Sequence, residues 1–191
     1  MGGPLAGIRV IDLSAMLSAA WAADILDDQG ADVIKVEPPG SGDHVRALRN
    51  RSHGLASMFL NINRSKRSMT IDLKHPDGPR VFLDLVRGAD VVVENFSRGT
   101  ADRLGIGHAA CRSANPRIVY CAVSGFGAEG VVGEDRAYDT VIQALSGIMM
   151  LSGEEGDPPI KIGMPFADLI SPLFGVIGIL SALRVRDATG E

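Results

Sequence analysis

Ala89-Asp-Val-Val-Val-Glu-Asn95 is the stretch that decides the fold of this 191-residue chain. Its three consecutive valines show no polar alternation, which is typical of a strand buried on both faces of a parallel sheet. Further short strands, rich in β-branched residues, are predicted on either side of it, at residues 8–13, 31–37, 69–73 and 117–123. Helical or loop segments separate them. This alternation predicts an α/β domain with a mostly parallel sheet flanked by helices.

The helices are predicted from apolar periodicity and from the residues that stop them. An alanine-rich helix from Leu17 to Gln29 ends at Gly30, which suits a helix C-cap. Further helical segments are predicted at about residues 76–87, 99–114, 138–151 and 166–186. Residues 40–68 are polar and basic, and we expect them to be rich in loops.

Composition excludes several classes of protein. The chain is 46% hydrophobic and 22% charged, as in ordinary globular domains, and its net charge of −4 argues against a nucleic-acid partner. Cys111 and Cys121 lack metal-binding spacing and are predicted to be free, reduced thiols. No signal peptide is apparent, and the apolar run from Leu169 to Leu183 is too short for a membrane span. We therefore expect a soluble, cytoplasmic protein without membrane association.

Motifs for common cofactors are missing. The first predicted strand runs into Ser14–Trp21, which holds no glycine where a dinucleotide fingerprint needs three, so NAD or FAD binding in the usual mode is disfavoured. The chain has neither a P-loop nor the GxSxG motif of a nucleophile elbow. Its four histidines are scattered without metal-ligand spacing, so no metal site is expected.

Polar and aromatic residues gather where the predicted strands end. Ligands of open α/β sheets bind beyond the carboxyl ends of the strands. Lys74 and Arg103 could contact phosphates there, and Phe96 or Phe126 could contact an adenine ring. Each basic residue taken singly also fits a solvated surface charge. The Glu94-Asn95-Phe96 segment, which directly follows the three valines, suits a binding strand end.

Asp168 is the last carboxylate before the long apolar run, at the predicted start of a helix. Backbone amides and the helix dipole favour an ionised carboxylate at such a position. A partly desolvated carboxylate is a candidate nucleophile toward an activated acyl group. The alternative is an aspartate that caps the helix and has no chemical role.

The chain resembles the family III CoA-transferases, a group that includes formyl-CoA transferase, carnitine CoA-transferase and α-methylacyl-CoA racemase. The resemblance covers essentially the whole chain. It rests on ordered blocks at Pro4–Leu13, Gly30–Pro39, Asn63–Ser68, Ala89–Phe96, Ser124–Gly127, Tyr138-Asp139 and Gly163–Asp168. It implies that residues 1–191 form a Rossmann-like, CoA-binding portion of the large domain of such an enzyme, with the catalytic aspartate included.

The resemblance also implies a mechanism. Asp168 would attack an acyl-CoA thioester to form a mixed anhydride and then an aspartyl-CoA thioester, from which a small carboxylic acid takes the CoA. No metal and no NAD would take part. Leu17, Arg136 and Tyr138 would lie near the thiol end of CoA. The full set of implied coenzyme A contacts is Met16, Leu17, Ile71, Asp72, Leu73, Lys74, Asn95, Phe96, Ser97, Arg103, Arg136 and Tyr138.

Two departures from the family pattern bear on the reaction. Tyr138 stands where the racemases have a histidine, which removes one of the two bases of racemisation and favours CoA transfer. An enzyme similar to α-methylacyl-CoA racemase remains the alternative. Leu17 stands where the formyl-CoA transferases have glutamine, which argues against formyl and oxalate chemistry.

Length is the largest departure, because family members are roughly twice as long as this chain. The small domain, the C-terminal segment that returns to the large domain and a glycine-rich loop over the active site are expected to lie outside these 191 residues. The resemblance implies an interlocked homodimer, or completion of the fold by a second chain. A truncated, non-catalytic CoA-binding or dimerisation subunit is a further alternative.

Overall fold

A five-stranded parallel sheet forms the centre of the computed structural model, which describes residues 2–127 and 137–190. The strand order is β5-β2-β1-β6-β7, and Val10 of the central strand pairs with Val33 on one side and Val91 on the other. The predicted α/β class is confirmed. The strands are β1 (Arg9–Asp12), β2 (Asp32–Glu37), β5 (Arg67–Thr70), β6 (Val91–Glu94) and β7 (Val119–Ala122).

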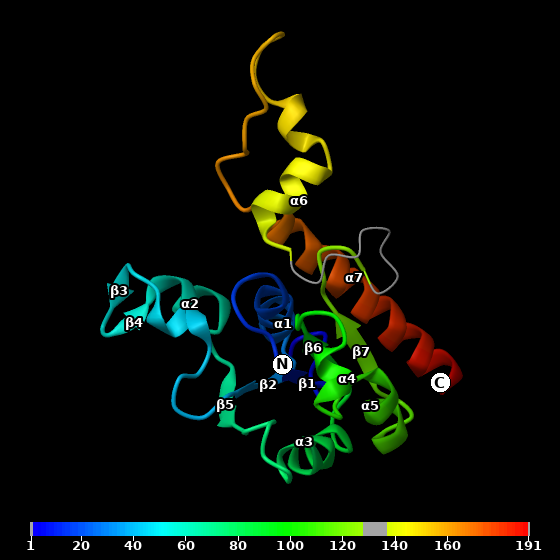
Figure 1. Ribbon diagram of the computed structural model, residues 1–191. Coiled ribbons are helices and arrows are strands. Elements are labelled where there is room, and N and C mark those ends of the chain that lie inside the picture. Colours follow the sequence, from blue (N-terminus) through cyan, green and yellow to red (C-terminus); the bar gives the residue numbers. More distant parts are fainter. Residues whose placement is uncertain (1, 128–136, 191) are drawn as a thin grey trace.

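Helices cover both faces of this sheet (Figure 1). Strand β6 shows why its apolar run has no polar alternation: Val91 and Val93 pack into the core beneath α1 and α7, whereas Val92 packs into the core beneath α3 and α5. Both faces of the strand are therefore buried. The helices are α1 (Ser18–Asp28) and α7 (Phe166–Thr189) on one face, and α3 (Gly78–Val86), α4 (Thr100–Arg103) and α5 (His108–Ala114) on the other.

The segment predicted to be rich in loops also contains four short regular elements that the sequence pattern did not predict. Val45, Ala56, Phe59 and Ile62 pack with Ala20 of α1 into a small third core. Three arginines, Arg46, Arg49 and Arg51, lie between Val45 and the other apolar positions in the sequence, so their common burial is not evident from the local pattern. The elements are a 3₁₀ turn η1 (His44–Ala47), a hairpin of β3 (Arg51–Ser52) and β4 (Leu55–Ala56), and α2 (Ser57–Ile62).

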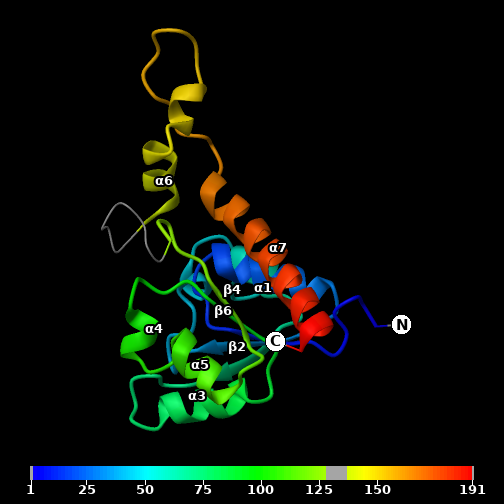
Figure 2. The ribbon, with the colours of Figure 1, turned by 90° about the vertical axis from the view of Figure 1, so that its right-hand side faces the viewer.

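The helix predicted at about residues 138–151 is interrupted. Helix α6 (Asp139–Leu145) ends before Gly147, whose φ of 77° is left-handed, and a 3₁₀ turn η2 (Ile148–Leu151) follows. A residue in the left-handed conformation cannot continue a right-handed helix, and glycine adopts this conformation without the strain that a side chain would cause. Figures 1 and 2 show α6 and η2, together with the chain between η2 and α7, extending away from the sheet.

Helix α7 is long and apolar enough to cross a membrane by length and composition, with 24 residues. A core helix of a soluble protein meets the same criterion, and α7 packs Val176, Ile179 and Leu183 into the core that it shares with α1 and the sheet. The helix runs three residues beyond its predicted end and stops at Gly190. Its N-terminal part lies beside α6, near the carboxyl edge of the sheet (Figure 2).

Candidate active site

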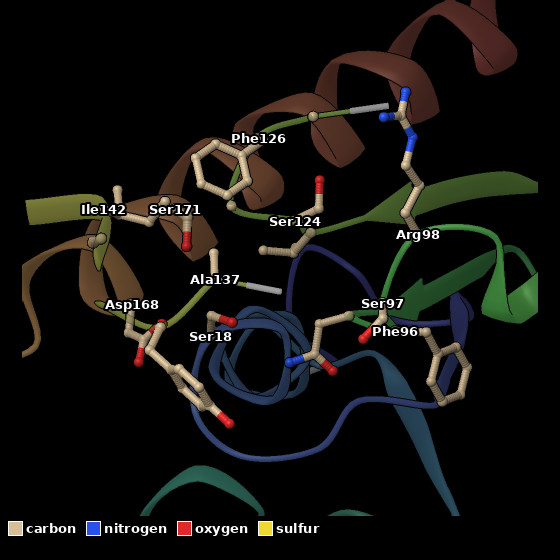
Figure 3. Close-up of a pocket in the computed structure, with 16 residues that line it drawn as sticks. Ser18, Phe96, Ser97, Arg98, Ser124, Phe126, Ala137, Ile142, Asp168 and Ser171 are labelled. Atoms are coloured by element: carbon tan, nitrogen blue, oxygen red, sulfur yellow. The ribbon is translucent and has the colours of Figure 1, made fainter. Parts of the chain in front are cut away.

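A cavity of about 370 Å³ lies at the carboxyl edge of the sheet, where strand ends and the starts of α1, α6 and α7 converge. Figure 3 shows Asp168, Ser171 and Ile142 on one side of it and Phe96 and Arg98 on the other. Parallel strands place all their carboxyl ends at one edge, which is why segments far apart in sequence meet here. The lining comprises Ser18, residues 95–98, residues 123–127, Ala137, Tyr138, Ile142, Ala167, Asp168 and Ser171.

Asp168 is the third residue of α7 and faces this cavity. It does not occupy the N-cap position of the helix, which belongs to Pro165. The carboxylate of Asp139, the first residue of α6, accepts hydrogen bonds from the backbone N–H of Ala167 (2.7 Å) and of Asp168 (3.4 Å). The first amides of a helix lack partners inside the helix, and here a residue 28 positions earlier supplies one. Asp168 is therefore held by a cap and is not itself the cap.

The electrostatic surroundings of Asp168 oppose its ionisation. Burial raises the pKa of Asp168 above its ordinary value, and the negative charge of Asp139 raises it further. Two amides that were expected to favour an ionised Asp168 point at Asp139. A carboxylate that is poorly hydrated and close to a like charge is more reactive as a nucleophile than one in water.

The turn after β6 is built from paired hydrogen bonds. The side-chain amide of Asn95 donates to the carbonyl of Ala15 (2.7 Å), and its oxygen accepts from the Ala15 N–H (2.9 Å). The buried Glu94 accepts from the N–H of Phe96 (2.6 Å). Burial raises the pKa of Glu94, and this hydrogen bond opposes the rise. These contacts hold the loop after β1 against the turn after β6, and residues 95–98 of that turn line the cavity.

A buried ionic network also holds the loop after β1 in place. Lys35 of β2 donates to the carbonyl of Ser14 (2.9 Å) and lies 3.0 Å from Asp43 and 3.7 Å from Asp12. The other oxygen of Asp43 accepts from the N–H of Met16 (3.2 Å). Met16 has a φ of 63°, a left-handed conformation that is strained for a side chain of this kind. The network therefore holds a strained residue at the sheet edge.

Asp43 is itself fixed by Glu37, at the end of β2. Glu37 accepts hydrogen bonds from the Asp43 N–H (2.8 Å) and from the Arg46 guanidinium, which it binds through both oxygens. Burial alone would raise the pKa of Glu37, but these hydrogen bonds and one from Ser68 lower it to about 2. The Arg46 guanidinium also lies 3.9 Å from the ring centre of Phe59, which ties the loop to α2.

The sequence-predicted site residues fall into three groups. Asn95, Phe96, Ser97, Tyr138 and Asp168 line the cavity. The others that the structure describes lie outside the cavity lining, and Arg136 lies outside the described residues. Those beyond the lining are Met16 and Leu17 after β1, Ile71, Asp72, Leu73 and Lys74 after β5, and Arg103 in α4.

The segment after β5 and the turn after β6 contribute to the same core. Ile71 is buried, and Leu73 and Phe96 pack against the same core. Lys74 and Arg103 remain accessible, with the Lys74 N–H bonded to the Asp72 side chain and the Arg103 guanidinium bonded to Thr100. Each of the two cations therefore keeps an exposed side chain.

Sequence reasoning did not single out Asp139 as the cap of α7, nor Ser18, Arg98, Ala137 and Ser171 as cavity residues. For Ser171 a signal existed, because a residue three positions after Asp168 lies on the same helix face. For Asp139 it did not, because its hydrogen bonds to α7 connect distant segments. Within residues 2–127 and 137–190, no group of His, Cys, Asp and Glu is arranged to hold a metal ion.

Comparison with known proteins places this arrangement in a family. The chain is 42% identical over 190 residues to the acetyl-CoA:oxalate CoA-transferase of Acetobacter aceti, an alignment that covers 99% of this chain and 49% of that protein. It is 40% identical over 195 residues to the succinate–glutarate CoA-transferase of Agrobacterium fabrum, with 98% and 49% covered. The chain thus spans about half the length of these relatives.

The fold gives the same assignment. The crystal structure of a CAIB/BAIF family protein from Brucella suis superposes with a TM-score of 0.93 at 41% sequence identity, over 100% of this chain and 52% of that one. Residues 5–191 match the sequence profile of CoA-transferase family III. On sequence and fold together, this chain belongs to CoA-transferase family III.

Proposed function

We propose that this chain carries the nucleophile of a CoA-transferase, Asp168, which moves CoA from an acyl-CoA to a carboxylic acid. The observation that carries the proposal is the position of Asp168: a half-buried carboxylate on the wall of a cavity at the carboxyl edge of a parallel sheet. Its raised pKa marks a group that is poorly solvated and close to a like charge. The family membership supplies the class of reaction.

The reaction is balanced without an oxidant or a further reactant. An oxygen of Asp168 attacks the thioester carbonyl carbon, the C–S bond breaks, and CoA thiolate leaves with a mixed anhydride on the enzyme. The thiolate then attacks the aspartyl carbonyl and releases the donor acid. An acceptor carboxylate attacks this aspartyl-CoA thioester, and the thiolate finally takes the acceptor acyl group and frees Asp168. Each step exchanges one acyl bond for another.

Coenzyme A is assigned to the carboxyl edge of the sheet. The apolar Leu73 and Phe96 would receive the adenine or the pantetheine, and Lys74 and Arg103 would contact phosphates. Tyr138, at the start of α6, borders the cavity beside Asp168 and would lie near the thioester. The proposed set is Met16, Leu17, Ile71, Asp72, Leu73, Lys74, Asn95, Phe96, Ser97, Arg103, Arg136 and Tyr138.

A small carboxylic acid is the proposed acceptor, and the reaction needs neither metal nor NAD. The similar proteins from Acetobacter and Agrobacterium are named for oxalate and for succinate and glutarate, which are all dicarboxylic acids. The oxalate relative weighs against the inference, drawn from Leu17, that oxalate chemistry is disfavoured. Dicarboxylic acids are therefore the acceptors to test before others.

We propose that a second polypeptide segment covers the exposed side of α7. The proposed location of the protein is the cytoplasm. Two large apolar side chains of α7 face solvent: Phe174 is 68% exposed and Ile177 is 58% exposed. Large exposed apolar groups on neighbouring turns mark surfaces that associate. A second copy in an interlocked dimer, or a separate chain, would supply the cover.

The test is transfer of CoA from succinyl-CoA or acetyl-CoA to oxalate or glutarate by the chain, with and without a candidate completing chain. Asp168→Ala should abolish transfer, and hydroxylamine added with acyl-CoA should trap an aspartyl hydroxamate on Asp168, detected by peptide mass spectrometry. Unchanged turnover in the Ala variant contradicts the proposal. Deuterium incorporation at the α-carbon without an acceptor would instead indicate epimerisation, and CoA binding without turnover a non-catalytic subunit.

A further inference from the structure

Gln143 is an unusually buried residue in an exposed part of the chain. It is 1% exposed, whereas Leu145 and Leu151, in the same extension, are 61% and 85% exposed. Its side-chain oxygen accepts from the Ile162 N–H (2.9 Å), and its amide nitrogen donates to the carbonyl of Met164 (3.1 Å). These two bonds tie α6 to the segment that leads into α7.

The same amide nitrogen makes a third contact, which points toward the active site. It donates to one oxygen of Asp139 at 2.6 Å. The other oxygen of Asp139 accepts from the N–H groups of Ala167 and Asp168. Both oxygens of Asp139 are therefore used, one by Gln143 and one by the first turn of α7. Figure 1 shows α6 beside the beginning of α7, where this chain of contacts runs.

We propose that Gln143 is a positioning residue for Asp168, acting through Asp139. This rests on the proposed function, in which Asp168 is the nucleophile. Without the amide donor, the Asp139 carboxylate is free to rotate about its side-chain bonds, and the first turn of α7 loses its fixed acceptor. A nucleophile displaced by about 1 Å can lose on the order of a hundredfold in rate. The effect falls on the rate of acylation, because Gln143 does not line the cavity.

The separation between Gln143 and the cavity distinguishes positioning from substrate contact. Gln143 instead borders a second, apolar hollow formed with Ile148, Leu151 and Phe166. Its side-chain hydrogen bonds lead to the Asp168 N–H through one intermediate carboxylate, and that carboxylate is also one of the two causes that raise the pKa of Asp168. Holding Asp139 in place therefore fixes both the position of the α7 first turn and the charge beside the nucleophile.

The chain offers a variant that removes the donor and keeps the shape. Gln143→Glu retains an acceptor for the Ile162 N–H but places an oxygen against both Asp139 and the Met164 carbonyl. The double variant Asp139→Asn/Gln143→Glu restores one donor and one acceptor with their directions reversed, since the asparagine amide can donate to the glutamate while its oxygen still accepts from α7. Ser146→Ala is the matched control, because the Ser146 hydroxyl, at the C-cap of α6, donates to the backbone carbonyl of Gln143 (3.1 Å) and not to its side chain.

We expect Gln143→Glu to lower kcat for transfer, and the rate of hydroxamate formation on Asp168, by about ten- to a hundredfold. The KM for acyl-CoA should change by less than about threefold, since no cavity contact is removed. The double variant should recover on the order of tenfold of the lost rate. Ser146→Ala should stay within about twofold of the parent chain.

A second readout needs no turnover. Amide hydrogen exchange, followed by NMR, should show Ala167 and Asp168 exchanging about tenfold faster in Gln143→Glu than in the parent chain and in Ser146→Ala. Unchanged exchange and unchanged kcat in Gln143→Glu, or no recovery in the double variant, would overturn the positioning role. If the parent chain forms no hydroxamate and Asp168→Ala keeps its turnover, the proposed function is contradicted. The hydrogen-exchange measurement then still tests whether Gln143 holds the first turn of α7.

Discussion

Asn95 pairs with the backbone of Ala15 through both of its polar atoms, at 2.7 and 2.9 Å, across 80 residues of sequence. An asparagine side chain matches a peptide group in shape and polarity, so it binds the loop after β1 as a neighbouring strand would. The amide of this implied CoA contact is therefore already engaged with the protein. The pairing brings the strand ends that border the cavity into one rigid edge.

Replacing Asn95 should loosen that edge. We expect Asn95→Ala to lower the free energy of unfolding by roughly 1–3 kcal/mol, because the Ala15 N–H and carbonyl lose their partner. The KM for acyl-CoA should rise as well, since the loop carries Met16 and Leu17. Thermal unfolding and steady-state kinetics measure the two effects. Asn61→Ala, at an exposed site in α2, is the control and should change neither. Equal effects of the two variants would refute the bracing role of Asn95.

Lys35 should be required for folding to a degree unusual for a lysine. Its side chain is 2% exposed and lies between Asp43 and Asp12, so Lys35→Met leaves Asp43 without its cation. We expect a loss of about 3–5 kcal/mol in the free energy of unfolding. Denaturant titration measures it, and Lys161→Met, at an exposed lysine, serves as the comparison. Adding Asp43→Asn to Lys35→Met should return part of the lost stability.

Asp24, which lies fully buried in α1, should destabilise the fold at neutral pH. Burial raises its pKa to about 6, against opposing effects from Arg64 and Lys66. A group with a raised pKa favours the folded state below its unfolded pKa, and this contribution is lost as the pH rises through the folded pKa.

Asp24→Asn should therefore raise the free energy of unfolding by up to about 3 kcal/mol at pH 8. The gain should shrink steadily as the pH falls from about 6 toward 4. Thermal unfolding of variant and parent at about pH 8 and about pH 4 measures the difference. Asp77→Asn, at an exposed carboxylate, should behave alike at the two pH values. A gain for Asp24→Asn that is independent of pH would contradict the assignment.

Gly125 should not tolerate a side chain. A Cβ built there lies 2.2 Å from the Cβ of Ala137 and 3.1 Å from Ile142, so Gly125→Ala must push the loop after β7 away from α6. Overpacking of this kind costs about 1–3 kcal/mol, and the displaced loop borders the cavity, so the transfer rate should fall too. The double variant Gly125→Ala/Ala137→Gly removes the collision with Ala137 and should recover most of both losses, because the flexible end of the Ile142 side chain can move by a few tenths of an ångström. Gly178→Ala, whose Cβ meets nothing within 4 Å, is the control.

The pH dependence of transfer should report the surroundings of Asp168. The nucleophile must be ionised, so kcat/KM should fall as the pH drops through the raised pKa of Asp168. Asp139→Asn removes one of the two causes of that rise, and we expect it to move this acidic limb to lower pH. A pH–rate profile of both proteins measures the shift. A limb that stays in place, in a folded variant, would show that burial alone sets the pKa.

Much of the fold could be predicted because burial leaves a local pattern. The valines of β6 predict a strand covered on both faces, and Val91, Val92 and Val93 do face two different cores. The short elements between β2 and β5 were not predicted, because charged residues lie between apolar positions such as Val45 and Phe59 that pack into one core. Local pattern likewise did not reveal that Gly147 would break a helix in two.

The sequence by itself determined the alternation of strands and helices, the family resemblance and the identity of Asp168 as the carboxylate to test. These depend on residue order and spacing, which are local properties. Only the tertiary structure decided that Asp139 caps α7, that Gln143 holds Asp139 and that Asn95 engages Ala15. Two of these contacts join residues 28 and 80 positions apart, and the short link from Gln143 to Asp139 acquires its role only from the first of them. Their geometry exists only once the parallel sheet has brought its strand ends to one edge.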